Sequence, residues 1–379
     1  MPGWLLASFL LLPAQAGVEA GGSLKTLYSY SRSPLTGREH WLDLNRARLS
    51  LKGEAWGLKA SVDYDHELRF GSQLRSLESR LFGLAEPASF LDMDQTISSG
   101  TDAGWRHRLY RGWVEAAALG WTLRFGRQRV AWGTGKIWNP VDVLNPYLPT
   151  ALERDQRLGV DALHLRRGLG DLGQAEGVWA LGRSWVETDV LTRVKGNYRG
   201  ADAALLGGKV AGSTGSWLAG GELAWDLGGG SLHGEWTYTD LETRTPFWRA
   251  LVGYEYSLSN ARSAALRDLW FNVELFQNGR GATDPSRYDV NLLRSGREVA
   301  LARTYLGTAL KKDLHPLVVV ELALLQNLND QSRFLSPSIS WNAWRELHLS
   351  GGWQHFGGRQ RSEFGRLPNL AFLQAQYFF

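Results

Sequence analysis

Apolar and polar residues alternate with a period of two along most of the chain after residue 22. The last segment shows the pattern most clearly, because one face carries Ala371, Leu373, Ala375, Tyr377 and Phe379. Gln374 and Gln376 lie on the other face. Barrel strands that cross a membrane need ~9–11 residues of such alternation, separated by turns. The pattern therefore predicts an all-β protein, a transmembrane antiparallel up-and-down β-barrel.

The alternating segments predict about eighteen strands, with sixteen as the alternative. Both termini are expected on the periplasmic side, which requires an even number of strands. Segment 187–196 alternates least clearly, but long and short connections alternate sensibly only when it is counted. The predicted strands are 22–31, 39–52, 57–70, 105–118, 121–133, 157–168, 174–185, 187–196, 201–211, 216–227, 231–240, 247–258, 268–279, 301–312, 316–327, 333–342, 346–357 and 368–379.

The longer connections are expected on the extracellular side, at 71–104, 134–156, 280–300 and 358–367. Residues 76–82 favour a helical turn or two within the first of them. Connections longer than ~15 residues are usually functional or mobile. Segment 134–156 is rich in Pro, Asn and Asp, and such loops often fold inward in porin-type barrels. It is a candidate for narrowing the lumen.

The N-terminal segment is typical of an export signal. Residues 4–12 form a short apolar core, and Ala14-Gln15-Ala16 fits the small-x-small cleavage pattern, with Ala20 as a second candidate. No Lys or Arg precedes the apolar core, and a short buried helix or strand is the alternative. We expect a cleaved signal peptide at 1–20 and one barrel domain at 21–379.

Composition fits a barrel and excludes several other classes. The chain has 18 Trp, 12 Tyr and 44 Gly, and aromatic residues favour membrane–water interfaces. It has no Cys, which removes thiol catalysis, disulfides and thiolate metal sites. The net charge is only +4, without a long basic block, so nucleic-acid binding is not expected. No run of ~18 apolar residues suggests a membrane-spanning helix.

The charged face of the strands should line the lumen, because a charge facing lipid costs ~2–4 kcal/mol near the midplane. These charges either orient polar solutes or pair across strands and hold the wall in shape. The lumen-lining candidates are Arg46, Arg48, Arg124, Glu222, Asp226, Glu235, Arg249, Glu255, Glu274 and Glu321.

Charged residues around segment 134–156 are candidates for anchoring it. Arg127 and Arg129 stand at a strand end and are expected to pair with Asp142, Glu153 or Asp155 in the loop. The alternative is that the same arginines face the permeating solute.

No catalytic, metal or cofactor site is expected. The eight histidines belong to no recognisable nucleophile or metal motif. His233 with Glu235, and His348 with Ser350, share a face only because strand residues alternate. Asp92, Asp94 and Asp102 read as a solvated acidic loop.

Several motifs resemble those of porin-like outer-membrane barrels of Gram-negative bacteria, which are distantly similar to the alginate-export porins. The resemblance runs from about residue 40 to the C-terminus and rests on 125–135, 138–142, 153–161, 274–281 and 326–332. It implies a barrel with a solute or polymer channel, and it brings no catalytic residues.

We therefore expect an outer-membrane channel for passive passage of small hydrophilic solutes. The alternatives are a conduit or sheath for an exported polymer or for a redox or periplasmic partner protein, and an outer-membrane hydrolase. Expected partners are outer-membrane lipid, the barrel-assembly machinery and the solute, with a homo-oligomer or a periplasmic protein as further possibilities. Phe379 resembles the terminal assembly signal of such barrels and should face lipid, while Phe378 points inward.

Overall fold

The computed structural model describes residues 17–379 except 78, 80–89, 155, 158 and 295–297. Most of the predicted signal peptide, residues 1–16, lies outside the described residues, and residues 17–20 belong to the first strand. The cleavage site therefore stays a prediction.

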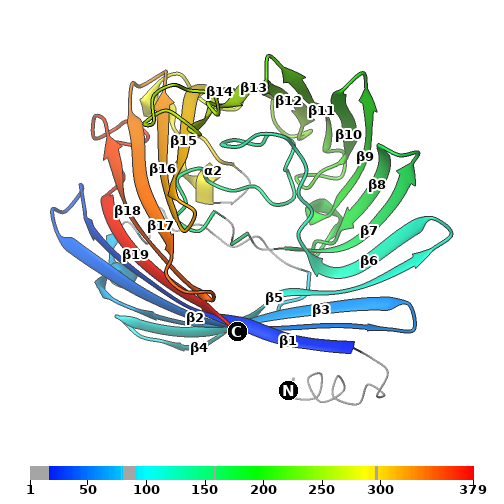
Figure 1. Cartoon of the computed structure of the whole chain (residues 1–379), viewed down its shortest axis with the longest axis horizontal. Helices are drawn as coiled ribbons and strands as arrows, with labels where there is room; N and C mark the ends of the chain where they lie inside the picture. The colour runs from blue at the N-terminus through cyan, green and yellow to red at the C-terminus, as the bar shows by residue number, and fades with distance from the viewer. Residues whose placement is uncertain (1–16, 78, 80–89, 155, 158, 295–297) are drawn as a thin grey trace.

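Antiparallel pairing between successive strands closes a barrel of eighteen strands, with one extra strand outside the ring (Figure 1). All predicted strands are present, including the one at 187–196, so sixteen is wrong. The strands are β1 (Gly17–Arg32), β2 (Glu39–Ala55), β3 (Leu58–Phe70), β4 (Asp94–Ser99), β5 (Ala103–Ala118), β6 (Trp121–Gln128), β7 (Val160–Leu169), β8 (Gly173–Ala180), β9 (Asp189–Tyr198), β10 (Ala201–Lys209), β11 (Trp217–Leu227), β12 (Gly230–Asp240), β13 (Phe247–Ser257), β14 (Trp270–Asn278), β15 (Thr304–His315), β16 (Val318–Asn327), β17 (Arg333–Asn342), β18 (Leu347–Gly357) and β19 (Asn369–Phe378).

The barrel closes between its first and last strands. The β1–β19 register runs from Ser23 opposite Phe378 to Arg32 opposite Asn369, as the sequence predicts for the closing pair. The backbone of Phe379 continues the seam, because its carbonyl accepts the Gly22 N–H at 2.8 Å. The Phe378 ring meets His348 edge-on, with ring centroids 5.2 Å apart.

Tight turns at one end of the barrel set the register of several hairpins. Trp56-Gly57, with φ of 53° and 75°, and Leu119-Gly120, with φ of 55° and 78°, both have positive φ at successive residues. Two such residues make the type I′ turn, whose twist matches that of paired strands. Gly supplies the second position because it has no Cβ to clash.

The extra strand β4 was not predicted. It pairs with the upper part of β5, where Asp94 lies opposite Arg108 and Ser99 opposite Gly104. Strand β6 pairs only with the lower part of β5, from Gly112 down to Ala118, so it leaves that edge of β5 open. Strand β4 covers the open edge, which would otherwise expose unpaired backbone groups.

In the part of the chain that the structure describes, the helices with defined bounds are short: η2 (Ser72–Arg75), η3 (Trp185–Glu187), η4 (Pro285–Arg287) and α2 (Val290–Arg294). None of the helices in the described part of the chain is long and apolar enough to cross a membrane. The helical turn predicted at 76–82 falls partly outside the described residues, and η2 ends just before it.

The two faces of the wall differ sharply. Large apolar side chains such as Leu205, at 68% exposed, and Phe125, at 55%, point outward. Charged side chains such as Glu274 and Asp65 are fully buried on the inward face. They are buried because loops fill much of the interior, and this is where the candidate site lies.

Candidate functional site

The connection between β6 and β7, residues 129–159, folds into the barrel instead of projecting from it (Figure 1). Its apolar side chains drive this, because Trp132, Trp138 and Val141 are at most 5% exposed. They pack against inward-facing residues of the wall such as Phe276 and Val178. Strand β6 consequently ends at Gln128, earlier than the predicted 121–133. We call residues 129–159 the inner loop.

Two wall carboxylates hold the first part of the inner loop by its backbone. Glu235 Oε1 accepts the N–H of Gly135 at 2.6 Å and that of Thr134, and its Oε2 accepts the N–H of Val141 at 3.2 Å. Glu274 accepts the N–H groups of residues 136–138 at 2.7 to 3.2 Å. Charge-assisted bonds of this kind contribute about 1.5–3 kcal/mol each.

Gly135 makes this tight arrangement possible. A Cβ at Gly135 would lie 1.9 Å from the Trp138 carbonyl oxygen, a distance no real contact shows. Gly133 has φ of 103°, a backbone conformation that side chains disfavour. The two glycines therefore let five successive backbone N–H groups, from 134 to 138, face two carboxylates.

The far part of the inner loop crosses the lumen to the strands β1 and β2. Glu153 binds Lys25 at 2.7 Å and Arg46 at 2.7 Å. Burial alone would raise the pKa of Glu153, but hydrogen bonds and the charges of Arg46 and Lys25 lower it to about 2. The carboxylate is therefore ionised at any pH at which the barrel would work. Farther round the wall, Gln354 donates to the Thr150 carbonyl at 3.1 Å.

An internal ion pair shapes the middle of the inner loop. Asp142 accepts from Arg157 at 2.7 Å and caps Asn145 N at 3.2 Å. Burial raises the pKa of Asp142 to about 7, against the opposing effect of Arg157. Asp142 therefore stabilises the loop from within and does not reach the wall arginines.

Among the described residues, the structure does not bring the predicted anchoring pairs together. Arg127 binds Asp161 of β7 at 2.8 Å instead of a loop acid. By alternation Arg127 shares the outward face with Phe125, and the carbonyl of Leu91 covers it. Arg129 is exposed and makes no ion pair with a described residue, and Asp155 lies outside the described residues.

Most predicted lumen residues lie inside the barrel and are already paired. Arg48 binds Asp65, Arg124 binds Glu115, Glu222 binds Arg193, Arg249 binds Glu298 and Glu255 binds Lys136. These ion pairs brace the wall, as the second interpretation expects, and they line the interior. Asp226 is exposed toward the end with the short turns, and Glu321 is exposed on the inward face of β16.

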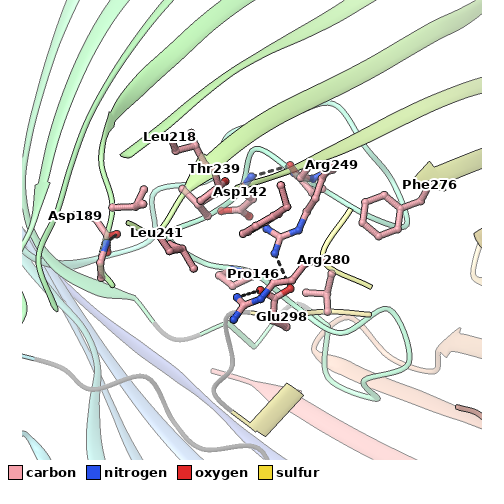
Figure 2. A pocket seen from close by; sticks show the side chains of 17 residues that line it. Asp142, Pro146, Asp189, Leu218, Thr239, Leu241, Arg249, Phe276, Arg280 and Glu298 are labelled. Atoms are coloured by element: carbon pink, nitrogen blue, oxygen red, sulfur yellow. Dashed lines mark hydrogen bonds and ion pairs between the residues drawn. The ribbon is translucent and has the colours of Figure 1, made fainter. Parts of the chain in front are cut away.

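The inner loop separates two cavities. The outer cavity, about 100 Å³, lies between Asn139–Pro146 and the extracellular ends of β9 to β14. Figure 2 shows Arg249 and Arg280 converging there on Glu298, at 2.6 Å and 2.5 Å. The inner cavity, about 310 Å³, lies on the periplasmic side between Lys136, Ala151–Leu152 and the strands β14 to β19. A solute that crosses the barrel must pass the loop between them.

Sequence reasoning missed the group that fastens the last extracellular loop. Glu363 is buried and accepts from Tyr305 Oη at 2.5 Å, Asn327 Nδ2 at 2.8 Å and Leu301 N at 3.1 Å. The sequence predicts a longer extracellular connection at 358–367 and gives no role to any of its residues. An acidic residue in a loop gives no sequence signal that it will be buried, because its partners come from two other parts of the chain, around residues 301–305 and at residue 327.

Glu363 should make the stability of the barrel depend on pH. Burial raises its pKa to about 7, although Tyr305 and Leu301 N oppose this, from an ordinary value of 4.5. The folded state therefore holds the proton more tightly, so this stabilisation is complete below pH 4.5 and is lost as pH rises through 7. Thermal unfolding should occur at lower temperature at pH 8 than at pH 5, and Glu363→Gln should reduce the difference. An unchanged pH dependence in that variant would contradict the assignment. The raised pKa of Asp142 makes stability fall with pH in the same direction, so Asp142 should account for the pH dependence that remains in the Glu363→Gln variant.

The histidines considered as catalytic candidates make structural contacts. His233 lies 3.2 Å from Glu274 and helps to hold that anchor, and Glu235 binds loop backbone instead of His233. His348 packs on Phe378. In the described ranges of the chain, no three metal-binding side chains gather at one point.

No family model matches the sequence, and no curated protein sequence matches it. Solved structures of outer-membrane porins do match its fold. Acinetobacter baumannii OccAB4 aligns with a TM-score of 0.59 and 10% identity over 97% of this chain and all (100%) of that one. Pseudomonas aeruginosa OccK7 (OpdD) aligns with a TM-score of 0.58 and 10% identity over 96% of this chain and 98% of that one. Pseudomonas aeruginosa OccD3 (OpdP) aligns with a TM-score of 0.57 and 9% identity over 95% of this chain and 91% of that one.

These matches confirm the porin-like part of the resemblance, and they do not show the likeness to alginate-export porins. The matched proteins are channels and not enzymes. At 9–10% identity the similarity concerns the fold. This chain has the fold of the outer-membrane porins, with an inner loop fastened across its lumen.

Proposed function

We propose that the protein is an outer-membrane channel for the passive passage of small hydrophilic solutes, exported with a signal peptide at 1–20. The observation that carries this proposal is the fastening of the inner loop by Glu235 and Glu274 on one side and by Lys25 and Arg46 on the other. An eighteen-stranded barrel is wide enough for an aqueous lumen, and a loop held across it sets the width of the path.

The same loop argues against a conduit or sheath. A barrel that encloses a polymer or a partner protein needs a wide lumen, whereas this interior holds buried clusters around Trp132 and Trp138. The contacts favour small solutes over an exported chain.

Planar-bilayer recording of the purified, folded protein tests the proposal. We expect discrete, ohmic conductance steps from single channels. A folded barrel that inserts into the bilayer and never conducts would refute it.

The inner cavity predicts a preference for anions. It is lined by Lys136, Arg154 and Lys311 and by one carboxylate, Glu321, and since Glu255 pairs with Lys136, the excess is one positive charge. A cavity of one predominant sign raises the local concentration of the opposite ion. In a KCl gradient the reversal potential should show chloride preference, and Lys311→Glu should shift it toward potassium. Equal reversal potentials for both proteins would contradict the prediction.

A further inference from the structure

Four neighbouring strands carry polar side chains on the outward face of the wall. On β1 and β2 these are Thr26, Asp43 and Asn45. On β3 and β5 they are Tyr64, His66 and His107, and Gln95 of β4 lies beside His107. We call these seven residues the outer polar patch.

The patch lies within the apolar belt, not beyond its edge. On β1, Thr26 stands between the exposed side chains Leu24 and Tyr28. On β2, the polar pair stands between the exposed side chains Trp41 and Leu49. The same order holds on the outward faces of β3 and β5. Polar groups at this depth are unfavourable against lipid chains, which offer no hydrogen bonds.

The rest of the wall shows what a lipid-facing surface of this protein looks like. On β11 the outward residues between Trp217 and Trp225 are Ala219, Gly221 and Leu223. On β13, Ala250 and Val252 follow Trp248. These two segments carry no polar outward side chain, in contrast to the outward faces of β1, β2, β3 and β5.

Only part of the patch is satisfied within the chain. Thr26 Oγ1 donates to Asp43 at 3.1 Å. His107 meets Tyr64 through one ring nitrogen and Gln95 at 3.1 Å through the other, and it stacks on His66 with centroids 5.7 Å apart. Neither the Asn45 amide nor the His66 ring has a hydrogen-bond partner among the described residues.

The patch borders a hollow in the outer wall. The hollow has a volume of about 630 Å³, and Asn45, His66, Leu68, Trp105 and Tyr377 are among the residues that line it. Its lining is mainly apolar, with the unpartnered amide and imidazole at its surface. It is large enough to receive an aromatic side chain of another protein, and Trp41 and Tyr28 stack beside it on the same face, with centroids 6.3 Å apart.

We propose that this face of the barrel, from β1 to β5, docks against a second copy of the same chain. The face carries both halves of the required contacts. A carboxylate and an amide can accept hydrogen bonds, and the imidazoles and the same amide can donate them. The hollow can receive the aromatic rings that project from the same face of the other copy. A surface that holds both halves is self-complementary, and two-fold symmetry then satisfies both copies at once. Lipid would fill the hollow but would leave Asn45 and His66 without partners.

Single cysteines test the contact directly, because the natural chain has none. Asn45→Cys in isolated outer membranes, treated with a short bis-maleimide, is expected to give a crosslinked band at twice the monomer mass. Ala219→Cys is the matched control on the apolar wall and should stay at the monomer mass. Equal crosslinking of both variants would show random collision and overturn the proposal.

A second experiment measures the assembly itself. The wild-type barrel, extracted in a mild detergent, should have the mass of more than one copy. Asn45→Leu combined with His66→Leu should give the mass of one copy with unchanged single-channel conductance, since both side chains face away from the lumen. A wild-type barrel that has the mass of one copy, or that carries a different protein or only lipid on this face, would overturn the proposal.

Discussion

Replacing Glu235 and Glu274 together with glutamine is expected to raise the single-channel conductance roughly two- to threefold. The two carboxylates accept the backbone N–H groups of residues 134–138 and 141 and so fasten that part of the inner loop to the wall. Glutamine is nearly the same size, but it loses the negative charge and places an NH₂ group against N–H donors. The loop should leave the wall and widen the path.

The same double variant should keep the barrel intact, because the inter-strand pairing of β12 and β14 does not depend on these side chains. Glu321→Gln is the matched control. It removes a carboxylate on the inward face of β16 that lines the inner cavity and does not bind the loop backbone. It should alter ion preference slightly and leave the conductance near that of the wild type. A double variant with wild-type conductance and wild-type current noise would mean that the loop does not limit the path.

The strands could be predicted because alternation is a local property. Each strand faces two environments, so a segment such as 187–196 carries the signal even when it is weak. Strand β4 has no such signal, since it pairs along one edge only and most of its residues are exposed. Its position depends on the early end of β6, and no pattern in the sequence predicts where β6 ends.

The inner loop shows where local reasoning ends. Its length and its content of Pro and Asn indicate a functional loop. The sequence makes it a candidate for folding inward but does not show that it does so. What decides the fold is the match between its N–H groups and Glu274, which lies 136 to 138 residues away along the chain. Arg127 shows the same limit, because its partner Asp161 lies opposite it on β7, 34 residues along the chain, and not in the inner loop.

Arg46→Met is expected to destabilise the barrel by about 3–5 kcal/mol, because it leaves buried carboxylates without their shared partner. Arg46 binds Glu67 at 2.7 Å and Glu153 at 2.7 Å, and it lies 3.8 Å from Asp65. Urea unfolding in detergent micelles, followed by the fluorescence of the 18 tryptophans, measures the change. Arg124→Met is the control, since Arg124 pairs with Glu115 on the wall and does not touch the inner loop.

A double-mutant cycle with Glu153→Met separates the loop contact from the rest of this cluster. If Arg46 holds the far part of the inner loop through Glu153, the double variant should lose about 2 kcal/mol less free energy of unfolding than the sum of the two single variants. The cycle is measured at pH 8, because removing Arg46 lets burial raise the pKa of Glu153 above its wild-type value of about 2. Strictly additive effects would show that the contact between Arg46 and Glu153 does not hold this part of the loop. The conductance of Arg46→Met would then stay at the wild-type value. If the far part of the inner loop is released, the conductance should rise.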